Sequence, residues 1–519
     1  MSSKCRVLLV GFEEWENLGL RYMAAYLQEN GIEAHVQPYA KGGGSEILEA
    51  IRAGEPSLVG FSLIFQRMLP DFAELIAFLR ENGVGAHFTM GGHFPTVDCD
   101  SVFEAIPGLD SIVRCEGEDT LLELARKLDD PAVWRAIKSL AYRGEAGIEV
   151  NPSRALRSDL DSLPFPTRPA SLPNVRGVRM CSLCASRGCS FDCCFCSIRE
   201  FYSTAPGPNR RYRSPSNVAD EMEVLHKDRD VRIFVFEDDD FAMRSPANKE
   251  WIRDFVDALK TRRLADDILW RISCRVDEID SATLSLMSEA GLTCVYLGIE
   301  SGSDQGLRYF NKHYSVDDVH RSIAEIRKAG MPFEFGFMIM HPECTFDTIM
   351  SDIGFLKRIS SQGDAVVHFT KMLPYAGTAA EAQLIEQKRL TGDVTAPDYP
   401  YRDPRLDLLQ MFFTQAFHYR NFDTNGLVER LRYAKLDALV AARFRAEDLD
   451  SQGYLNELYG LIEKANFACL ERMSMATRFM KDRSEEQILS QWWLPEKLAR
   501  EEVAEERRIT TELERIVPA

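Results

Sequence analysis

Hydrophobic positions in the first 150 residues alternate between short apolar runs and segments with helical spacing. The runs CRVLLVG, EAHVQPY, SLVGFSLIF, GAHFTMGG and DSIVRCEGE predict strands. The segments LGLRYMAAYLQEN, SEILEAIRAG, LPDFAELIAFLREN and DTLLELARKL repeat their apolar residues every three or four positions, which predicts helices. This alternation indicates a parallel, doubly wound, Rossmann-like sheet, in which ligands bind at the carboxyl ends of the strands.

A proline-rich stretch follows at residues 151–175. It carries Pro152, Pro164, Pro166, Pro169 and Pro173. Because proline fixes φ and removes a backbone donor, we expect an extended linker between two domains.

The strand–helix alternation resumes over residues 176–385. The candidate strands are GVRMCSLCA, VRIFVFE, ILWRISCR, TCVYLGIES, FEFGFMIM and AVVHFTK. Six units are too few to close an eight-stranded barrel, so the pattern predicts a partial (β/α)6 barrel. From about residue 386 the strand pattern disappears, and residues 386–519 predict a helical domain. The expected architecture is therefore α/β, with domains at 1–150, 176–385 and 386–519 and a linker at 151–175.

Composition and charge narrow the class of protein. Hydrophobic residues make up 45% and charged residues 27% of the chain, as in ordinary globular proteins. The formal charge of −18 disfavours non-specific binding of nucleic acid, although it leaves room for an anionic substrate on a local basic patch. No apolar run reaches the roughly 18 residues that span a bilayer, and MSSKCRVLLVG shows no signal peptide, so we expect a cytoplasmic protein without a membrane segment.

The 13 cysteines are unevenly distributed, and six of them lie between Cys181 and Cys196. An odd number in a chain without a signal peptide argues against a disulfide framework. Within SRGCSFDCCFCS, the thiols of Cys189, Cys193 and Cys196 stand at the short spacings that hold iron–sulfur clusters. Three ligands on a four-iron cluster leave one iron open to another molecule.

Structural zinc is the alternative for these cysteines, and it normally needs two separated pairs of ligands. Cys181 and Cys184 could form a second pair. They lie in a predicted strand, however, where residues three apart point to opposite faces, so they could share one metal only across a bulge. Cys181, Cys184 and Cys194 are therefore interpreted as ordinary thiols.

The segment CSFDCCFC matches the CxxxCxxC signature of the radical S-adenosylmethionine (SAM) enzymes, with the aromatic Phe195 directly before the last cysteine. The resemblance implies a [4Fe–4S] cluster on Cys189, Cys193 and Cys196. It also implies SAM-binding residues on the cluster loop and at the carboxyl ends of successive strands: Phe195, Glu237, Asp238, Asp239, Ser273, Arg275, Glu300, Met338 and Ile339. LPYAGT after the sixth strand is a further element typical of the family.

The first domain resembles the cobalamin-binding domain of B12-dependent radical SAM enzymes through GFS, MGGH and CEGEDT. This resemblance implies cobalamin contacts at Leu18, Gly19, Ser62, Leu63, Gly91, Gly92, His93, Glu116 and Gly117. The first loop, GFEEWENLGLRY, lacks the DxHxxG motif whose histidine ligates cobalt in other cobalamin domains, and His35, His87 and His93 are interpreted as ordinary residues rather than cobalt ligands. A domain retained for packing without the cofactor is the alternative.

Together these resemblances imply a cobalamin-dependent radical SAM methyltransferase acting on an unactivated carbon of a small-molecule biosynthetic intermediate. One SAM would methylate cobalamin, and a second would yield the 5′-deoxyadenosyl radical that removes a substrate hydrogen atom. The cofactors carry this chemistry, so no catalytic side chain is assigned. The implied partners are the small-molecule substrate and a reductase, flavodoxin or ferredoxin as electron donor, with no nucleic acid. Candidate substrate contacts in the helical domain are His418, Arg420, Arg430 and Arg432.

Several alternatives remain open at this point. The same cofactors could methylate phosphorus, or support a cyclisation or rearrangement without net methyl transfer. A methylthiotransferase would need a cysteine-bearing first domain and usually a small terminal β-domain, and neither pattern is visible. A cobalamin or metal sensor would need an output module, and the helical segment offers no DNA-binding signature.

Overall fold

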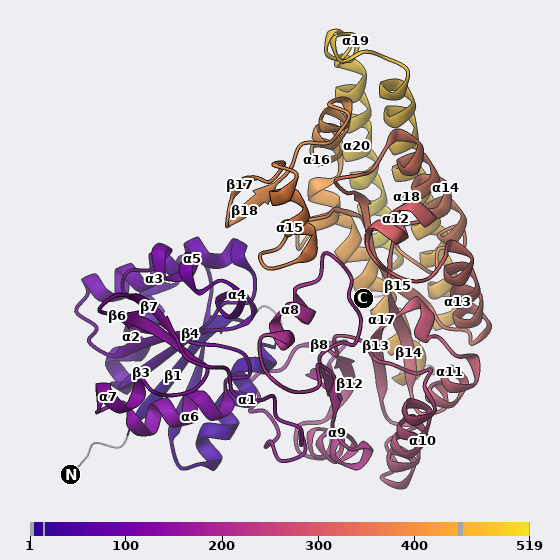
Figure 1. Ribbon diagram of the computed structural model, residues 1–519. Helices are drawn as coiled ribbons and strands as arrows, with labels where there is room; N and C mark the ends of the chain where they lie inside the picture. Colours follow the sequence, from indigo (N-terminus) through magenta and orange to yellow (C-terminus); the bar gives the residue numbers. More distant parts are fainter. Residues whose placement is uncertain (1–4, 14–15, 445–449, 518–519) are drawn as a thin grey trace. The chain divides into compact units, whose positions relative to one another are not determined.

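The computed structural model describes residues 5–13, 16–444 and 450–517. The chain forms two compact units, and both are discontinuous in sequence (Figure 1). The first unit comprises Met1–Leu172, Ser182–Asn217 and Leu373–Asp398. The second comprises Pro173–Cys181, Val218–Met372 and Tyr399–Ala519. Each unit is described by itself.

A seven-stranded sheet in the order β2-β1-β3-β4-β5-β6-β7 forms the centre of the first unit. Its first five strands in sequence are parallel, which confirms the doubly wound prediction. Their bounds are β1 Arg6–Phe12, β2 Glu33–Tyr39, β3 Leu58–Ser62, β4 His87–Gly91 and β5 Ser111–Val113. The strand order reverses between β1 and β3, where sheets of this topology bind ligands.

Helices cover both faces of this sheet (Figure 1). One face packs on α2 (Gly44–Gly54), α3 (Leu69–Glu81) and α5 (Cys99–Ala105). The other packs on α1 (Leu18–Glu29), α6 (Glu118–Lys127) and α7 (Pro131–Trp134). Burial on both sides explains why the strands are continuous apolar runs rather than alternating ones. The short α4 (His93–Val97) follows β4 directly.

Two β-hairpins in the first unit were not predicted. β6 (Leu140–Gly144) and β7 (Gly147–Val150) add antiparallel strands at one edge of the sheet. β17 (Thr391–Asp393) and β18 (Ala396–Asp398) pair beyond residue 386, so the expectation that strands end there was wrong. β7, β17 and β18 are short and largely exposed, so they lack the buried apolar positions on which a strand prediction depends.

The proline-rich stretch packs into the first unit. Residues 151–172 contain no helix or strand, as their prolines predict. Leu156, Leu160 and Leu163 are nevertheless buried, and Leu160 and Leu163 contact Leu18 and Tyr22 of α1. These residues therefore anchor the stretch to the first domain.

The sheet of the second unit has the order β16-β15-β14-β13-β12-β9-β8. It curls into a half-barrel, which confirms the prediction of a partial barrel. Neighbouring strands from β12 to β16 are parallel, and β8 runs antiparallel to β9 at the edge. Their bounds are β8 Asn174–Val175, β9 Val178–Leu183, β12 Val231–Phe236, β13 Leu269–Arg275, β14 Leu292–Glu300, β15 Phe333–Met340 and β16 Thr370–Lys371.

Alternate residues of these strands face two different environments. Phe236 and Trp270 pack with Phe255 of α10 (Pro246–Thr261) on the outer face. On the inner face, Ile233 and Leu269 belong to one cluster with Val440 of α17 (Leu427–Phe444). Both strand residues lie near the starts of their strands. Helix α17 therefore closes the amino-terminal end of the inner face.

The other helices fall into two groups. Those between the strands are α9 Pro215–Arg229, α11 Ser281–Ser288, α12 Asp304–Tyr309, α13 Val316–Lys328 and α14 Phe346–Ile359. Later helices, apart from α15 (Ala379–Glu386) of the first unit, are α16 Arg405–Phe422, α18 Ser451–Lys481, α19 Glu485–Ser490 and α20 Trp493–Ile516. They confirm the predicted helical segment. No helix in the described ranges is both long and apolar enough to cross a bilayer.

Candidate functional site

The three predicted cluster cysteines lie on one loop of the first unit, between β10 (Ser186–Arg187) and α8 (Ser197–Ser203). Cys189, Cys193 and Cys196 are all half-buried. The backbone N–H of Cys196 donates to the carbonyl of Cys193 at 3.2 Å, which turns the chain tightly between them. Gly188 has φ +83° and passes so close to the Asn209 carbonyl that a Cβ would lie 1.7 Å from it. The loop therefore needs glycine at this entry.

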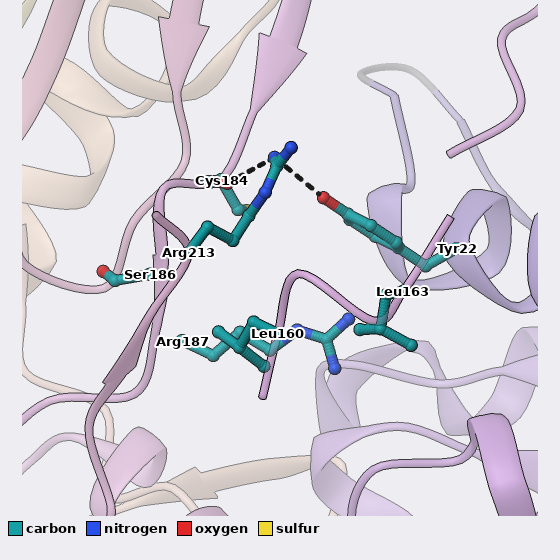
Figure 2. A pocket seen from close by; sticks show the side chains of 7 residues that line it. All are labelled: Tyr22, Leu160, Leu163, Cys184, Ser186, Arg187 and Arg213. Atoms are coloured by element: carbon teal, nitrogen blue, oxygen red, sulfur yellow. Dashed lines mark hydrogen bonds between the residues drawn. The ribbon is translucent and has the colours of Figure 1, made fainter. Parts of the chain in front are cut away.

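The donor set of this loop fits an iron–sulfur cluster. Among the described residues, no three His, Cys, Asp or Glu side chains already surround a metal position. Three half-buried thiols on one irregular loop could nevertheless supply three soft ligands, which would leave the fourth iron open to another molecule. A second zinc pair fits less well, because Cys181 is buried within β9 while Cys184 follows the strand. Figure 2 shows Cys184 in a pocket with Tyr22 and Arg213.

The segment after β16 holds the cluster loop from one side. The backbone N–H of Ala380 donates to the carbonyl of Cys194 at 2.9 Å. Gln66 fixes the same segment to the loop after β3: its side chain donates to the Val394 carbonyl at 2.6 Å and accepts from the Ala376 N–H at 2.7 Å. The LPYAGT element thus links the cluster loop to the first domain within one unit.

Buried arginines hold the chain on both sides of the cluster loop. Arg187 precedes the loop and Arg211 follows it, and both pair with Glu116, at 3.1 Å and 2.8 Å. Burial disfavours the ionised form of Glu116, but these two arginines outweigh burial and lower its pKa. Arg213 donates to the Cys184 carbonyl at 3.0 Å and to the Tyr22 hydroxyl at 3.4 Å (Figure 2).

Three of the predicted cobalamin residues lie at the carboxyl ends of neighbouring strands, beside the point where the strand order reverses. Ser62 ends β3, and its hydroxyl accepts a hydrogen bond from Asn17 at 3.4 Å. Gly91 ends β4, and Gly92 follows with φ +116°. A Cβ on Gly92 would lie 2.3 Å from the Leu63 carbonyl oxygen, so only glycine allows this close approach.

The other predicted cobalamin residues are more dispersed. Leu18 is buried and Gly19 is exposed in the first turn of α1. Leu63 is fully buried, and its N–H donates to the Gly91 carbonyl at 2.8 Å. Gly117 caps α6 and packs against Met23. Glu116 pairs with Arg187 and Arg211, so its carboxylate already has two protein partners.

The three histidines that were considered as cobalt ligands each lie against another side chain. The ring of His93 lies 4.4 Å from that of Phe201 in α8, and burial lowers its pKa to about 4. His87 bonds the Ser111 hydroxyl at 2.8 Å. His35 lies on β2 beside Glu33. Within the predicted cobalt-facing loop, residues 11–22, the sequence has no histidine, and residues 14–15 lie outside the described ranges.

The predicted SAM residues other than Phe195, which lies on the cluster loop, belong to the second unit. Glu237 and Asp239 are exposed directly after β12, while Asp238 between them is buried. Ser273 is half-buried on β13. Asp240, which the sequence analysis did not select, is buried and accepts the backbone N–H of Arg275 at 3.0 Å. It thereby ties the carboxyl end of β12 to that of β13.

Arg275 is buried, and its guanidinium bonds neighbouring protein groups. It pairs with Asp277 through two nitrogens, at 2.9 Å and 3.1 Å, and donates to the Lys312 carbonyl. Its guanidinium carbon lies 5.2 Å from the ring centre of Tyr314. Arg275 therefore helps to hold the turn at residues 312–314 in place.

Glu300 meets the same turn from β14. Its backbone has φ +69°, and a bulge separates it from Gly298 in the pairing with β15. Its carboxylate accepts from the Lys312 ammonium at 3.4 Å, and Lys312 is buried. The Tyr314 hydroxyl donates to the Gly298 carbonyl at 2.5 Å. Lys312 and Tyr314 therefore join the ends of β13 and β14, and they connect the two predicted SAM residues Arg275 and Glu300.

Asp352 of α14 holds the backbone that follows Glu300. One carboxylate oxygen accepts from the Gly302 N–H at 2.7 Å and from the Ser301 hydroxyl at 3.0 Å. Asp352 and Ser301 are both buried. A Cβ on Gly302 would lie 2.3 Å from Cβ of Phe355 in α14, so this glycine lets the helix pack against the turn. The positive φ of Glu300 can persist because these surrounding contacts hold the backbone in place.

Met338 and Ile339 lie on opposite faces of β15. Met338 shares a face with Gly336 and Glu334, whereas Ile339 lies on the other face and is fully buried. Sequence reasoning missed four residues: Asp240, Lys312, Tyr314 and Asp352. Their partners are backbone groups or residues that lie far away in the sequence. The only local signal was the left-handed pair Asn311 and His313, two residue types tolerant of positive φ.

Comparison with known families agrees with this arrangement. Residues 7–125 match the B12 binding domain model, and residues 183–356 match the Radical SAM superfamily model. The chain therefore belongs to the radical SAM enzymes that carry a B12-binding domain. The cofactors of these two domains are a [4Fe–4S] cluster with SAM, and cobalamin.

Individual relatives align with much of the chain. An uncharacterized methyltransferase of Pyrococcus horikoshii is 28% identical over 367 residues, which cover 70% of this chain and 76% of the relative. An anaerobic magnesium-protoporphyrin IX monomethyl ester cyclase of Rubrivivax gelatinosus is 27% identical over 362 residues, 64% of this chain and 60% of the relative. The solved structure of OxsB, a cobalamin-dependent SAM radical enzyme, shares the fold with a TM-score of 0.70 and 18% identity, over 99% of this chain and 84% of OxsB.

Replacing Cys189, Cys193 or Cys196 with alanine should abolish the cluster, because each removes one of three thiolate ligands. Iron and sulfide content after anaerobic reconstitution, with the visible absorption band, measures this loss. Cys194→Ala is the matched control: it lies in the same loop, and its bond to Ala380 uses the backbone carbonyl. A cluster that survives Cys193→Ala and disappears in Cys194→Ala would contradict the ligand assignment.

Glu300→Gln should weaken SAM binding about 10- to 100-fold, the loss expected for one hydrogen bond to a charged group. Iron content should stay unchanged, since Glu300 is not a predicted cluster ligand. Equilibrium titration of the reconstituted protein with SAM measures the affinity. Glu289→Gln, an exposed residue paired with Lys260, is the control and should bind SAM normally. Equal affinity in both variants would remove Glu300 from the SAM site.

Asp352 should make stability depend on pH. Burial raises its pKa to about 7, although hydrogen bonds from Gly302 and Ser301 lower it. The folded protein then keeps a proton that the unfolded chain loses near pH 4, so the free energy of unfolding falls as pH rises from about 4 to about 7, by at most about 1.4 kcal/mol per pH unit. Asp352→Asn keeps an acceptor oxygen without a charge and should flatten this dependence.

Urea unfolding at several pH values within this window measures the effect. Asp347→Asn is the control on the same helix, because Asp347 is exposed and pairs only at the surface with Lys481. The control should retain the slope of the unmodified protein. A slope unchanged by Asp352→Asn would show that this carboxyl ionises normally.

Proposed function

We propose that this protein is a cobalamin-dependent radical SAM methyltransferase that methylates an unactivated carbon of a small-molecule biosynthetic intermediate. The observation that carries the proposal is the B12-binding domain and the three-cysteine cluster loop in one compact unit of a chain that also has a radical SAM half-barrel. The Pyrococcus horikoshii relative is named a methyltransferase, which supports methyl transfer as the reaction.

The chain's own residues would bind and orient three cofactors. Cys189, Cys193 and Cys196 would hold the cluster, and Glu300 would contribute to SAM binding. Ser62, Gly91 and Gly92 would line the cobalamin site at the strand ends of the first domain. When bound, the cluster and SAM supply a 5′-deoxyadenosyl radical and cobalamin supplies the methyl group.

Arg275 has a different proposed role from the one its position in the sequence suggested. Its guanidinium is engaged by Asp277 and the Lys312 carbonyl. We therefore assign it to positioning: it holds the turn that carries Lys312, and Lys312 in turn pairs with Glu300. A small-molecule substrate and an external reductant complete the requirements of the reaction, and we propose a flavodoxin or ferredoxin system as the electron donor.

Anaerobic reconstitution with iron, sulfide, cobalamin and SAM, followed by reduction, tests the function. We expect 5′-deoxyadenosine and, with SAM deuterated at its methyl group, transfer of the label to cobalamin and then to an acceptor among candidate carbon compounds, followed by mass spectrometry. Formation of 5′-deoxyadenosine without any transfer of label would refute methyl transfer. Failure to bind cobalamin would refute the cofactor assignment.

Electron paramagnetic resonance of bound cob(II)alamin should show no nitrogen superhyperfine splitting. The first loop has no histidine to ligate cobalt, and His87 and His93 are engaged with Ser111 and Phe201. We also expect the cofactor's own dimethylbenzimidazole to be displaced from cobalt. Splitting from one axial nitrogen would contradict this expectation. Repeating the measurement with His93→Gln separates a protein imidazole from the cofactor's own base.

A further inference from the structure

The inner face of the half-barrel carries a layer of charged and polar side chains above helix α17. Arg271 and Cys294 are paired in register, and one step further along the strands Tyr296 is paired with Glu334. Because strand residues alternate between faces, these side chains share the face that includes Glu300 and Ser273. Apolar residues around Val440 close the strand starts below them. The layer therefore forms the floor of the inner face.

Basic groups outnumber buried acidic groups in this layer. Arg271 donates to Glu334 at 3.0 Å, and Lys435 of α17 lies 3.9 Å from the other oxygen of Glu334. Lys435 also donates to the Phe333 carbonyl at 3.1 Å. A third cation, Arg432, lies one helical turn before Lys435, and its partner Glu429 has a side chain that is 45% exposed. Glu334 thus faces three cations, and the other carboxylate of this face, Glu300, pairs with the buried Lys312, so the floor keeps excess positive charge.

Three buried nitrogens at this floor, Arg271 Nε, Arg432 Nε and His368 Nδ1, have no hydrogen-bond partner among the described residues. The Tyr296 hydroxyl lies over Gly336, 2.8 Å from where a Cβ would stand. Burial raises the pKa of Tyr296 to about 12, so its hydroxyl is a donor at neutral pH. Burial, with Arg432 and Arg420, lowers the pKa of His368 to about 3, so its ring is neutral.

An aromatic surface adjoins these groups. The ring of Phe422, at the end of α16, lies 5.8 Å from that of His368, edge to face, and Phe422 is 53% exposed. His418, one turn earlier, lies 5.3 Å from the Phe422 ring. A flat or apolar group could therefore contact Phe422 beside His368.

We propose that Arg432 and Tyr296 form a binding site for an anionic group, a carboxylate or a phosphate, on the acceptor substrate. The guanidinium supplies charge and the phenol a second donor, the combination suited to an oxyanion in a partly buried place. This inference rests on the proposed function, since it assigns a substrate class to that half-barrel. It names Tyr296 as a substrate contact, which the sequence analysis did not. It also gives Arg432, already a candidate substrate contact, the specific role of binding the anion.

Small aromatic anions are the probes, because the natural acceptor is unidentified. Ligand-observed NMR on the oxidised, cofactor-loaded protein would compare benzoate and phenyl phosphate with the neutral isostere benzamide. We expect at least one anion to bind at least tenfold more tightly than benzamide. A preference for benzoate assigns a carboxylate, and a preference for phenyl phosphate assigns a phosphate. Benzamide binding as tightly as both anions would overturn the proposal.

Arg432→Gln should weaken binding of the preferred anion at least tenfold, and Tyr296→Phe should weaken it several-fold. Arg443→Gln is the matched control on the same helix, since Arg443 is exposed and donates to the Ala265 carbonyl. It should bind the probe normally. Should Arg432→Gln fail to fold, Arg432→Lys, which keeps the charge, should retain most of the affinity, while Tyr296→Phe alone still tests the site. Unchanged affinity in Arg432→Gln would overturn the proposed anion site. Where that variant does not fold, unchanged affinity in Tyr296→Phe would overturn it.

Assays of SAM cleavage keep this inference separate from the proposed function. The floor variants should still form 5′-deoxyadenosine from SAM, because neither residue is a predicted cluster or SAM ligand. Probe binding that depends on Arg432 in a protein that transfers no methyl group would overturn methyl transfer alone. Methyl transfer with probe binding indifferent to Arg432 would overturn the anion site alone.

Discussion

The pairing of Glu116 with Arg187 and Arg211 is the interaction on which the first unit depends. These two arginines stand on either side of the cluster loop, and the carboxylate that receives them follows β5 of the B12-binding domain. A buried ion pair of this kind contributes little net stability, but removing one partner is costly because the other charge stays buried. Its main effect is therefore to fix where the loop leaves and rejoins the domain. The bond from Ala380 to Cys194 then fixes the loop from a third segment.

Much of the fold follows from hydrophobic pattern, and the failures have physical causes. Largely buried parallel strands such as Leu58–Ser62 are recognisable because burial on both faces requires apolar runs. Thr391–Asp393 has no buried position, and its pairing depends on backbone bonds that leave no trace in side-chain pattern. The proline-rich stretch was recognisable as irregular. Its buried leucines were not a sufficient signal that it packs against α1.

The site was predictable where chemistry is local in sequence. The spacing of Cys189, Cys193 and Cys196 predicts the cluster loop because one short segment would supply all three thiolates. Lys312, Tyr314 and Asp352 could not be selected this way, since each acts through a partner on another element. Arg275 shows the same limit: its strand-end position was correct, yet only the structure reveals that Asp277 and the Lys312 carbonyl occupy its guanidinium.

The composition of the first unit has a consequence for how the chain folds. Its core is assembled from Met1–Leu172, Ser182–Asn217 and Leu373–Asp398. During synthesis from the amino terminus, the B12-binding sheet can form early. The hydrogen bonds of Gln66 to Ala376 and Val394, and that of Ala380 to Cys194, must wait until residues 376–394 have been made. Closing such long loops is slow, because their entropy is lost before distant contacts form. The half-barrel strands are synthesised within that interval, so a nascent chain contains all the strands of its half-barrel before its cluster loop is fully supported.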